Sequence, residues 1–388
     1  MTARPGGRPL DGVTVVSIEQ AVAAPLATRH LADLGARVIK IERPGAGDFA
    51  RAYDETVEGM SSHFVWLNRS KESVVLDLKS DAGRRAMHAL IARADVFVHN
   101  IGPGAARRLG VDASSLRAAH PGLVHVSVSG FGANGPFSDK KAYDLIIQCE
   151  SGLVSITGTP EEPSKVGIPV ADIAAGMYAY SGALAALIRS GRTGQGATVE
   201  VSMLEALAEW MGFPLNFTMY GGLAPARTGA AHAAIAPYGP FRCADDRVFL
   251  GVQNDREWEV FCRDVLADPG LLSDARFTTN MGRVGRRAEL VEVVEAAFSG
   301  LPVDEVTRRL DEANIANARL RDLASLAVHP QLAARDRWRT VGSPVGPLRQ
   351  LLPPALPDDL DPPLGPIPAL GEHTAAVLAE IGMAVDPA

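Results

Sequence analysis

Short apolar runs rich in β-branched residues alternate with helical patterns through the first third of the chain. The runs cover residues 12–19, 36–42, 73–78, 95–100 and 123–132, and each has the length of a buried strand. Between them, apolar residues recur at helical spacing over 25–35, 83–94 and 105–109. Strands that alternate with helices predict a parallel sheet with helices on both faces. Ligands of such α/β folds bind beyond the carboxyl ends of the strands.

The pattern changes after residue 170. A long helix rich in small residues is predicted over 173–191, followed by a strand over 198–203 and a helix over 204–213. The run 237–252 is typical of a hairpin with Asp245 and Asp246 at its turn. Further helices are predicted over 256–266, 287–299 and 303–316, and a closing helix over 371–382.

These elements divide the chain into a large domain, a small domain and connecting segments. Residues 212–236 are rich in Gly, Ala and Pro, which indicates a linker. Nine of the 27 prolines lie in 343–369, which favours an extended strap. We therefore expect a large domain over 1–211, the linker over 212–236, a small α+β domain over 237–325, a Pro-rich strap over 326–370, and a C-terminal helix over 371–388 that returns to the large domain.

Composition narrows the class of protein. Of 388 residues, 47% are hydrophobic, which argues against overall disorder, and the net charge of −7 without a basic stripe argues against nucleic-acid binding. The three cysteines are far apart, so neither a disulfide framework nor a zinc site is expected. No signal-peptide pattern opens the sequence, and no uncharged run reaches the ~20 residues of a membrane helix. We expect a cytoplasmic α/β protein that does not bind membranes.

The strand ends restrict the chemistry further. The first turn, EQAVAAP (19–25), has no glycine, whereas NAD and ATP loops need glycines to close on a phosphate. Neither cofactor is expected. Glu42 ends the second strand and has two interpretations, an exposed strand-end carboxylate, which is favoured, or a ribose-binding acid.

Two later segments carry candidate ligands or catalytic groups. In NIGPGAARRLG (100–110), Arg107 or Arg108 near a helix N-terminus suits a phosphate, but an ordinary loop with surface arginines fits equally well. Asp172 precedes the small-residue helix, where a capping role is favoured over that of a nucleophile. His63, His99, His125 and His232 lack metal-ligand spacing, so no metal site is expected.

Several ordered motifs together resemble the class III coenzyme A transferases, the family that includes formyl-CoA and carnitine CoA-transferases. The resemblance begins with PLDGVTVVSIEQAVAAPLATRHLADLGARVIKIERPGAGDFAR and continues through NRSKESVVLDLK (68–79), ADVFVHNIGPGAARRLG (94–110), GFGANGPFSDKKAYD (130–144), ITGTP (156–160), ADIAAG (171–176) and GRTGQGATVEVSMLEAL (191–207). It implies a Rossmann-like large domain with a small α+β domain, in an interlocked homodimer.

The resemblance also implies a mechanism, with CoA or acyl-CoA as substrate and without metal or ATP. An aspartate matching Asp172 attacks the acyl-CoA thioester and gives an aspartyl-acyl anhydride and CoA thiolate. CoA then forms an aspartyl-CoA thioester, from which an acceptor carboxylate takes it. Covalent catalysis of this kind splits one difficult exchange into several easier ones.

The positions implied to contact CoA lie in five segments of the large domain. They are Ala21, Val22, Ala23, Arg43, Leu76, Asn100, Ile101, Arg108, Leu109, Lys141 and Tyr143. Arg43, Arg108 and Lys141 suit the phosphates of CoA. The chain departs from the family at Val22, where other members have glutamine, and it lacks the glycine-run loop that some members place over the aspartate.

The main alternative is an α-methylacyl-CoA racemase of the same fold, which needs two bases on opposite faces of the α-carbon. Its second base, a histidine, is replaced here by Tyr143, and a phenol with a pKa of about 10 is a poor base. A non-enzymatic CoA-binding scaffold is the third possibility, and the presence of Asp172 argues against it. The N-terminal motif looks most like succinyl-CoA:itaconate or mesaconate CoA-transferases, which suggests a succinyl-CoA donor and a small dicarboxylate acceptor. Arg51, Arg227 and His232 are candidates for binding the acceptor.

Overall fold

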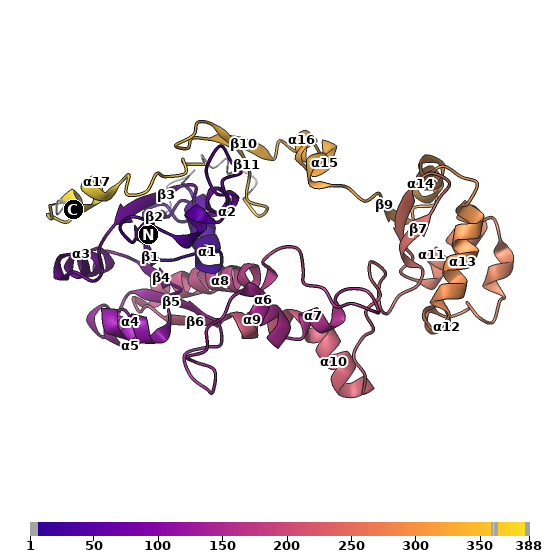
Figure 1. Cartoon of the computed structure of the whole chain (residues 1–388), viewed down its shortest axis with the longest axis horizontal. Helices are drawn as coiled ribbons and strands as arrows, with labels where there is room; N and C mark the ends of the chain where they lie inside the picture. Colours follow the sequence, from indigo (N-terminus) through magenta and orange to yellow (C-terminus); the bar gives the residue numbers. More distant parts are fainter. Residues whose placement is uncertain (1–6, 358–359, 361–363, 385–388) are drawn as a thin grey trace. The chain divides into compact units, whose positions relative to one another are not determined.

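The computed structural model describes residues 7–357, 360 and 364–384 (Figure 1). The chain divides into two compact units. Unit 1 comprises Met1–Ser151, Gly167–Met211 and Leu332–Ala388, and unit 2 comprises Gly152–Val166 and Gly212–Gln331. The chain therefore leaves unit 1 twice, the first time through a 15-residue excursion just before Asp172.

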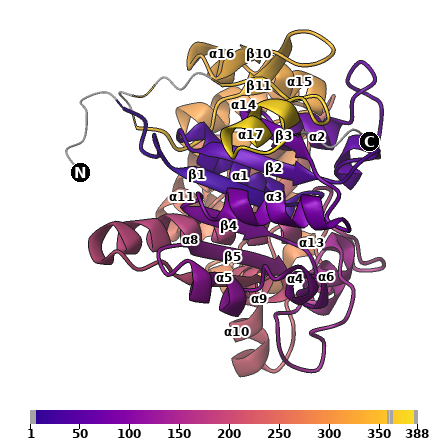
Figure 2. The ribbon, with the colours of Figure 1, turned by 90° about the vertical axis from the view of Figure 1, so that its left-hand side faces the viewer.

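Unit 1 is built on a six-stranded parallel sheet in the order β3-β2-β1-β4-β5-β6 (Figure 2). The strands are β1 Thr14–Ile18, β2 Arg37–Glu42, β3 Lys71–Val75, β4 Val96–His99, β5 Val124–Ser129 and β6 Thr198–Ser202. All six were predicted from their β-branched runs. After β3 the chain crosses to the other side of β1, so β1 and β4 flank the switch point at which α/β sheets bind ligands.

Helices cover both faces of this sheet. One face packs against α3 Asp81–Ile91, α4 Pro103–Leu109, α5 Ala113–Ala119 and α17 Thr374–Glu380. The other elements of the sheet domain are α1 Ala23–Asp33, the 3-10 helix η1 Phe49–Ala52, α2 Ser62–Leu67, α6 Asp144–Glu150, α8 Val170–Thr193 and α9 Met203–Trp210. Helix α8 is long and apolar enough to cross a membrane by length and composition, but here it packs against α1, α9, β5 and β6.

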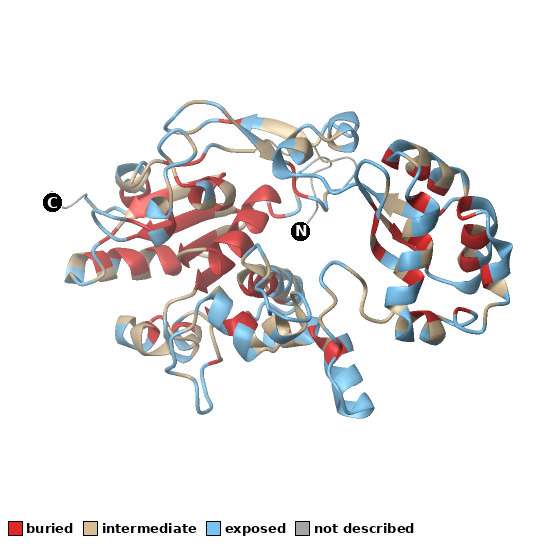
Figure 3. Cartoon of the chain, turned by 45° about the vertical axis from the view of Figure 1, so that its right-hand side comes forward, coloured by how far each residue is buried: buried red, intermediate tan, exposed pale blue. Residues whose placement is uncertain are grey.

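The core of unit 1 lies in the central strands, which are coloured as buried in Figure 3. Val15, Val16, Val74, Val96 and Phe97 have no exposed surface. Burial on both faces is the reason that these strands read as continuous apolar runs.

The C-terminal segment lies against the first part of the sheet. The hairpin β10 Trp338–Val341 and β11 Leu348–Leu351 precedes it. The Thr374 hydroxyl then accepts a hydrogen bond from the Val75 N–H at 3.0 Å, and Arg37 forms an ion pair with Glu380 at 2.7 Å. The strap expected over 326–370 thus contains this hairpin, because its prolines lie mostly outside the paired strands.

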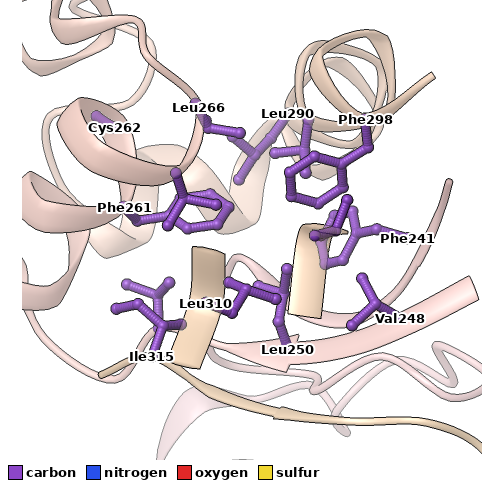
Figure 4. Packing of buried hydrophobic residues seen from close by; sticks show 14 of the residues in the cluster. Phe241, Val248, Leu250, Phe261, Cys262, Leu266, Leu290, Phe298, Leu310 and Ile315 are labelled. Carbon is purple, nitrogen blue, oxygen red and sulfur yellow. The ribbon is translucent and has the colours of Figure 1, made fainter. Parts of the chain in front are cut away.

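Unit 2 contains a three-stranded antiparallel sheet, β7 Tyr238–Arg242, β8 Arg247–Gly251 and β9 Ala316–Ala318. Phe241, Leu250, Phe261, Phe298 and Leu310 form its core (Figure 4). Its helical elements are α7 Leu153–Ile156, α10 Gly212–Gly221, α11 Asp255–Val260, the π-helix η2 Phe261–Val265, the 3-10 helix η3 Pro269–Leu272, α12 Asn280–Gly285, α13 Arg287–Phe298, α14 Val303–Glu312 and α15 Leu323–Ala327, and α16 Pro330–Ala334 lies where the chain returns to unit 1.

The predicted hairpin and the helices near 256–266, 287–299 and 303–316 are present, with different ends. Helix α10 was not predicted, since it lies in the stretch 212–236 that composition indicated to be a linker. Helix α6 was also not predicted, because it has only seven residues, of which Ile147 and Gln148 are buried, and so shows no helical period.

Candidate active site

Asp172 lies in the first turn of α8 and is partly buried. The helix begins at Val170, so Asp172 is its third residue rather than its N-cap. The N–H groups of Ala171 and Asp172 are instead accepted by Asp144 Oδ1, at 2.8 and 3.4 Å. The capping role favoured for Asp172 is therefore wrong, because Asp144 caps this helix from a distance of 27 residues in sequence and leaves the Asp172 carboxyl group free of that task.

Asp144 is itself fixed in place. It is the first residue of α6, and Gln148, one helical turn later, donates from Nε2 to Asp144 Oδ2 at 2.6 Å. Both oxygens of Asp144 thus have partners, and its negative charge is held close to Asp172.

The environment strongly disfavours a negative charge on Asp172. Burial raises its pKa from an ordinary 3.8 to about 7, with the charge of Asp144 acting in the same direction and a hydrogen bond from the Ala23 N–H opposing both. Because the carboxylate is poorly stabilised here, removing its charge by acylation is energetically favourable. Such a shift is typical of residues that do chemistry.

The Ala23 N–H that reaches Asp172 belongs to the first turn of α1, after the N-cap Val22. Helices α1 and α8 approach closely at this point. A Cβ atom at Gly176, one turn after Asp172, would lie 2.6 Å from the Ala23 carbonyl oxygen, so only glycine fits. The positive N-terminal end of α1 is therefore directed towards the Asp172 carboxyl group.

The turn before α1 is held by two side chains from elsewhere in the sheet. The N–H of Ala21 donates to Asp48 Oδ1 at 2.9 Å, and the N–H of Gln20 donates to Asn100 Oδ1 at 2.9 Å. Asn100 also donates to the Gln20 carbonyl at 2.8 Å. The predicted CoA residue Asn100 thus has a structural partner on the turn that contains three more of the predicted contacts.

A cavity of about 210 Å³ opens at the carboxyl ends of β1, β2, β3 and β4, at the switch point of the sheet. Four residues predicted to contact CoA line it, namely Arg43, Leu76, Ile101 and Leu109. Lys79 lines it too. Sequence reasoning missed this lysine, although it follows the third strand as Arg43 follows the second.

The other predicted CoA residues are not among those lining this cavity. Arg108 is exposed on α4, and Lys141 and Tyr143 are exposed on the segment before α6, with Tyr143 72% accessible. Tyr143 is the N-cap of α6 and directly precedes Asp144. The sequence adjacency therefore places Tyr143 beside the capping carboxylate.

Tyr53 is a further residue near the site that sequence reasoning missed. Its pKa is raised by burial and by the charges of Asp48, Asp172 and Tyr143. Its ring contacts His63 edge-on, with centroids 5.4 Å apart. A tyrosine in a loop after a 3-10 turn has no sequence pattern that would mark it.

Each of the three residues suggested for the acceptor has local partners. Arg51 forms a two-pronged ion pair with Glu42, at 2.7 and 2.8 Å. Arg227, in unit 2, donates to three carbonyls there, and the His232 ring stacks on Tyr238. Glu42 is 3% exposed, so the exposed carboxylate expected at this position is wrong, and Arg51 holds its pKa down to about 2 against the effect of burial.

No group of three or more His, Cys, Asp or Glu side chains that could hold a metal occurs within residues 7–357, 360 and 364–384. Of the four histidines considered above, His99 and His125 contact each other edge-on, with ring centroids 5.2 Å apart. The chemistry of the described site rests on carboxylates, backbone amides and cations.

Comparison with known proteins identifies the family. Residues 10–374 match the model of CoA-transferase family III. The chain is 36% identical over 336 residues to the acetyl-CoA:oxalate CoA-transferase of Acetobacter aceti, which covers 86% of each chain. It is 33% identical over 387 residues to the succinyl-CoA:glutarate CoA-transferase of Mus musculus, covering 96% of this chain and 86% of the mouse protein. A crystal structure of a CAIB/BAIF family protein from Brucella suis superimposes with a TM-score of 0.84 at 32% identity, over 97% of this chain and 100% of that one.

The parallel sheet with helices on both faces defines an α/β protein, in which Asp172 lies in the first turn of α8 close to the first turn of α1. The chain belongs to CoA-transferase family III. The family resemblance seen in the sequence is thereby confirmed.

Proposed function

We propose that this enzyme transfers CoA from an acyl-CoA donor to a small dicarboxylic acid by covalent catalysis at Asp172. The observation that carries the proposal is the environment of this carboxyl group, which raises its pKa to about 7 while the Ala23 N–H remains directed at it. The charge is destabilised before reaction and is removed in a neutral acyl intermediate. A hydrogen-bond donor is in place for an oxyanion that develops there.

Four bond exchanges complete the cycle. An Asp172 oxygen attacks the thioester carbonyl carbon, the C–S bond breaks, and CoA thiolate leaves an aspartyl-acyl anhydride. The thiolate attacks the aspartyl carbonyl carbon, and the donor acid leaves as a carboxylate. The acceptor carboxylate then attacks this aspartyl-CoA thioester and expels the thiolate again. Attack of the thiolate on the acceptor carbonyl yields the new acyl-CoA and restores Asp172.

The cavity at the strand ends is the proposed site for the nucleotide part of CoA. Leu76, Ile101 and Leu109 supply apolar surface for the adenine, and Arg43 and Lys79 supply cations for phosphates. Three exposed residues would extend this binding surface, namely Arg108, Lys141 and Tyr143. Arg108 precedes the cavity residue Leu109, and Lys141 and Tyr143 precede Asp144. Ala21, Val22 and Ala23 would contact the part of CoA next to the thioester.

The nature of donor and acceptor rests on the relatives. Both curated enzymes named above act on dicarboxylic acids, oxalate in one case and glutarate in the other, and their donors are acetyl-CoA and succinyl-CoA. A dicarboxylate acceptor and a succinyl-CoA donor are therefore the first to test, with itaconate and mesaconate included.

The protein is also proposed to act as a homodimer. Helix α10 exposes a row of large apolar side chains, among them Phe213, Phe217, Met219 and Tyr220, which is 83% accessible. Apolar surface of this kind is typical of an interface between subunits. The interlocked arrangement of the family would cover it.

The experiment incubates the enzyme with succinyl-CoA and a panel of acids: oxalate, glutarate, itaconate, mesaconate, malate, formate and carnitine. New CoA thioesters are followed by mass spectrometry, with Asp172→Ala as the inactive control and Arg189→Ala as a matched surface variant. We expect a new thioester that is absent with Asp172→Ala. Incorporation of deuterium at the α-carbon of a 2-methylacyl-CoA without any exchange of acyl groups would overturn the proposal in favour of a racemase.

A further inference from the structure

A network of charged side chains lies under the turn that follows β1. Glu19, Lys40, Asp48 and Lys71 are each 3% exposed or less. Lys40 Nζ lies 2.5 Å from Asp48 Oδ2 and 3.7 Å from Glu19 Oε1, and Lys71 Nζ lies 2.7 Å from the same Glu19 oxygen. Two carboxylates and two ammonium groups thus balance one another in the interior of unit 1.

The register of the sheet explains how these residues meet. Ser17 of β1 pairs with Lys40 of β2, and Lys40 pairs with Ser73 of β3. Residues that pair across a parallel sheet share a face, and Lys71, two residues before Ser73, shares it as well. A polar row therefore crosses three buried strands. Glu19 and Asp48 supply the anions from the segments that follow β1 and β2.

Asp48 links this network to the backbone near Asp172. Its Oδ2 receives the Lys40 ammonium, while its Oδ1 accepts the N–H groups of Ala21 and Ala50, both at 2.9 Å. Lys40 in turn is held by Asn68, whose Oδ1 lies 2.9 Å from Nζ. The Lys40 ammonium in the core thus fixes one oxygen of the Asp48 carboxylate, and the other oxygen binds the backbone of the turn.

Ala21, whose N–H donates one of these hydrogen bonds to Asp48, has a strained conformation. Ala21 has φ = +62°, in the left-handed region that alanine rarely adopts. Strain of this kind persists only when the surroundings impose it. The dihedral angles of Ala21 set the direction of the peptide groups that follow, and two residues later the Ala23 N–H faces the Asp172 carboxyl group and lowers its pKa.

We infer that Lys40 and Asp48 are positioning residues for CoA transfer, which hold Ala21 in its left-handed conformation so that the amides opening α1 are directed at the Asp172 carboxyl group. The inference rests on the proposed function of Asp172. Neither side chain touches the reacting atoms in this arrangement, since Lys40 is fully buried and Asp48 2% exposed. Their effect is transmitted through the backbone of residues 21–23.

Other groups around Asp172 lie outside the hydrogen bonds of this network. Asp144, on α6, raises the pKa of Asp172, and Tyr53 faces its charge from the segment after η1. Neither is bonded to Lys40 or Asp48 by any of the interactions described above. The charges of Asp48 and Asp172 both raise the pKa of Tyr53, whereas the hydrogen bonds of Asp48 extend towards Asp172 through the turn at Ala21.

The primary test compares Asp48→Asn with Ser73→Ala. Both substitutions remove a polar partner from the same face of the sheet, but Ser73 bonds to Glu42 and Gly371 and not to the turn. Asp48→Asn turns an amide donor or a neutral oxygen towards the Lys40 ammonium and loosens the hold on Ala21. We expect kcat for CoA transfer to fall at least about tenfold with Asp48→Asn, with KM for the acyl-CoA changed less than about threefold. Ser73→Ala stays within about twofold of wild type.

A rescue separates positioning from general stability. Glycine adopts positive φ without the cost that alanine bears, so Ala21→Gly in the Asp48→Asn background should restore a large part of the lost kcat. If Asp48→Asn does not fold, Ala21→Val replaces it, because a β-branched residue opposes the left-handed conformation and leaves every buried charge in place. The inference would be overturned if the loss of kcat equalled the loss of folded protein and Ala21→Gly restored none of it.

A second readout does not depend on activity. The Ala23 N–H lowers the pKa of Asp172, so misplacing it in Asp48→Asn should move that pKa upwards. The pKa is obtained from the pH dependence of the unfolding free-energy difference between Asp172 and Asp172→Asn proteins. An unchanged pKa contradicts the positioning role. Absence of CoA transfer in the wild-type enzyme contradicts the proposed function instead, and the pKa comparison still decides on the positioning role.

Discussion

Replacing Asp172 with asparagine should stabilise the folded protein at neutral and alkaline pH. The folded chain holds this carboxyl group partly buried beside Asp144, whereas the unfolded chain exposes it to water. The pKa is about 7 in the folded state against 3.8 ordinarily, so ionisation costs more in the folded protein than in the unfolded one. Asparagine has the same shape, keeps an oxygen for the Ala23 N–H, and carries no charge.

The size of the effect follows from the shift. At pH values above both pKa values, the difference corresponds to about 4 kcal/mol of unfolding free energy. A folded-state pKa that is raised means that the folded protein keeps its proton where the unfolded chain has lost it. The penalty on wild type is therefore absent well below pH 4, grows between the two pKa values, and is complete above about pH 7. Near pH 5 it is less than about 2 kcal/mol.

The assay is urea unfolding of wild type and Asp172→Asn at one protein concentration, near pH 5 and pH 8. Other titrating groups are common to both proteins, so their contributions cancel in the difference. Asp144→Asn serves as the background control. It removes the neighbouring charge but keeps an acceptor for the α8 N–H groups, so the gain from Asp172→Asn should be smaller there. A gain that is equal at the two pH values would refute the account of Asp172 as a destabilised carboxyl group.

Three further outcomes are expected. The value of kcat/KM for the acyl-CoA should rise with pH to a plateau, because the carboxylate is the attacking form, and the midpoint should lie near the Asp172 pKa of about 7. Asp144→Asn should move that midpoint to lower pH, and a flat pH–rate profile would contradict the assignment of this pKa to Asp172. Gly176→Ala should lower stability by about 1–3 kcal/mol and reduce kcat, because its Cβ would lie 2.6 Å from the Ala23 carbonyl oxygen, whereas Gly191→Ala, with no atom near its Cβ in the same helix, should be neutral or stabilising in thermal unfolding. Arg43→Gln and Lys79→Gln should each raise KM for the acyl-CoA about tenfold with little change in kcat, and a loss confined to kcat would show that these cations do not bind CoA.

Much of the sheet could be predicted from the sequence because its strands are buried on both faces. Runs such as those ending at Ile18 and His99 are apolar and β-branched, and the segments between them carry helical spacing. Helix α10 could not be predicted in this way, since Phe213, Leu215 and Phe217 expose their side chains and give no amphipathic pattern. These exposed apolar side chains are the ones that the proposed homodimer would cover.

Asp172 could be picked out from the sequence, but the residue that caps α8 could not, because it lies 27 positions before the capped N–H group. An aspartate in front of a helix is usually a cap, and only the hydrogen bonds from Ala171 and Asp172 to Asp144 show that the cap is supplied from α6. The structure thereby gives two similar residues different surroundings. Asp144 is satisfied by N–H donors, while Asp172 has a single backbone donor and a raised pKa.

The buried ion network could not be predicted either, because its members are also distant from one another in the sequence. Lys40 and Lys71 read as ordinary polar positions within strands, since their partners Asp48 and Glu19 are brought to them by the sheet. Isolated, either ammonium group would be too costly to bury, and burial does lower the pKa of Lys71 to about 8. A hydrophobic core would supply no acceptor for the Ala21 N–H. In this turn the buried Asp48 carboxylate accepts the N–H of Ala21, whose φ of +62° is against the preference of alanine, and the Lys40 ammonium balances the charge of that carboxylate.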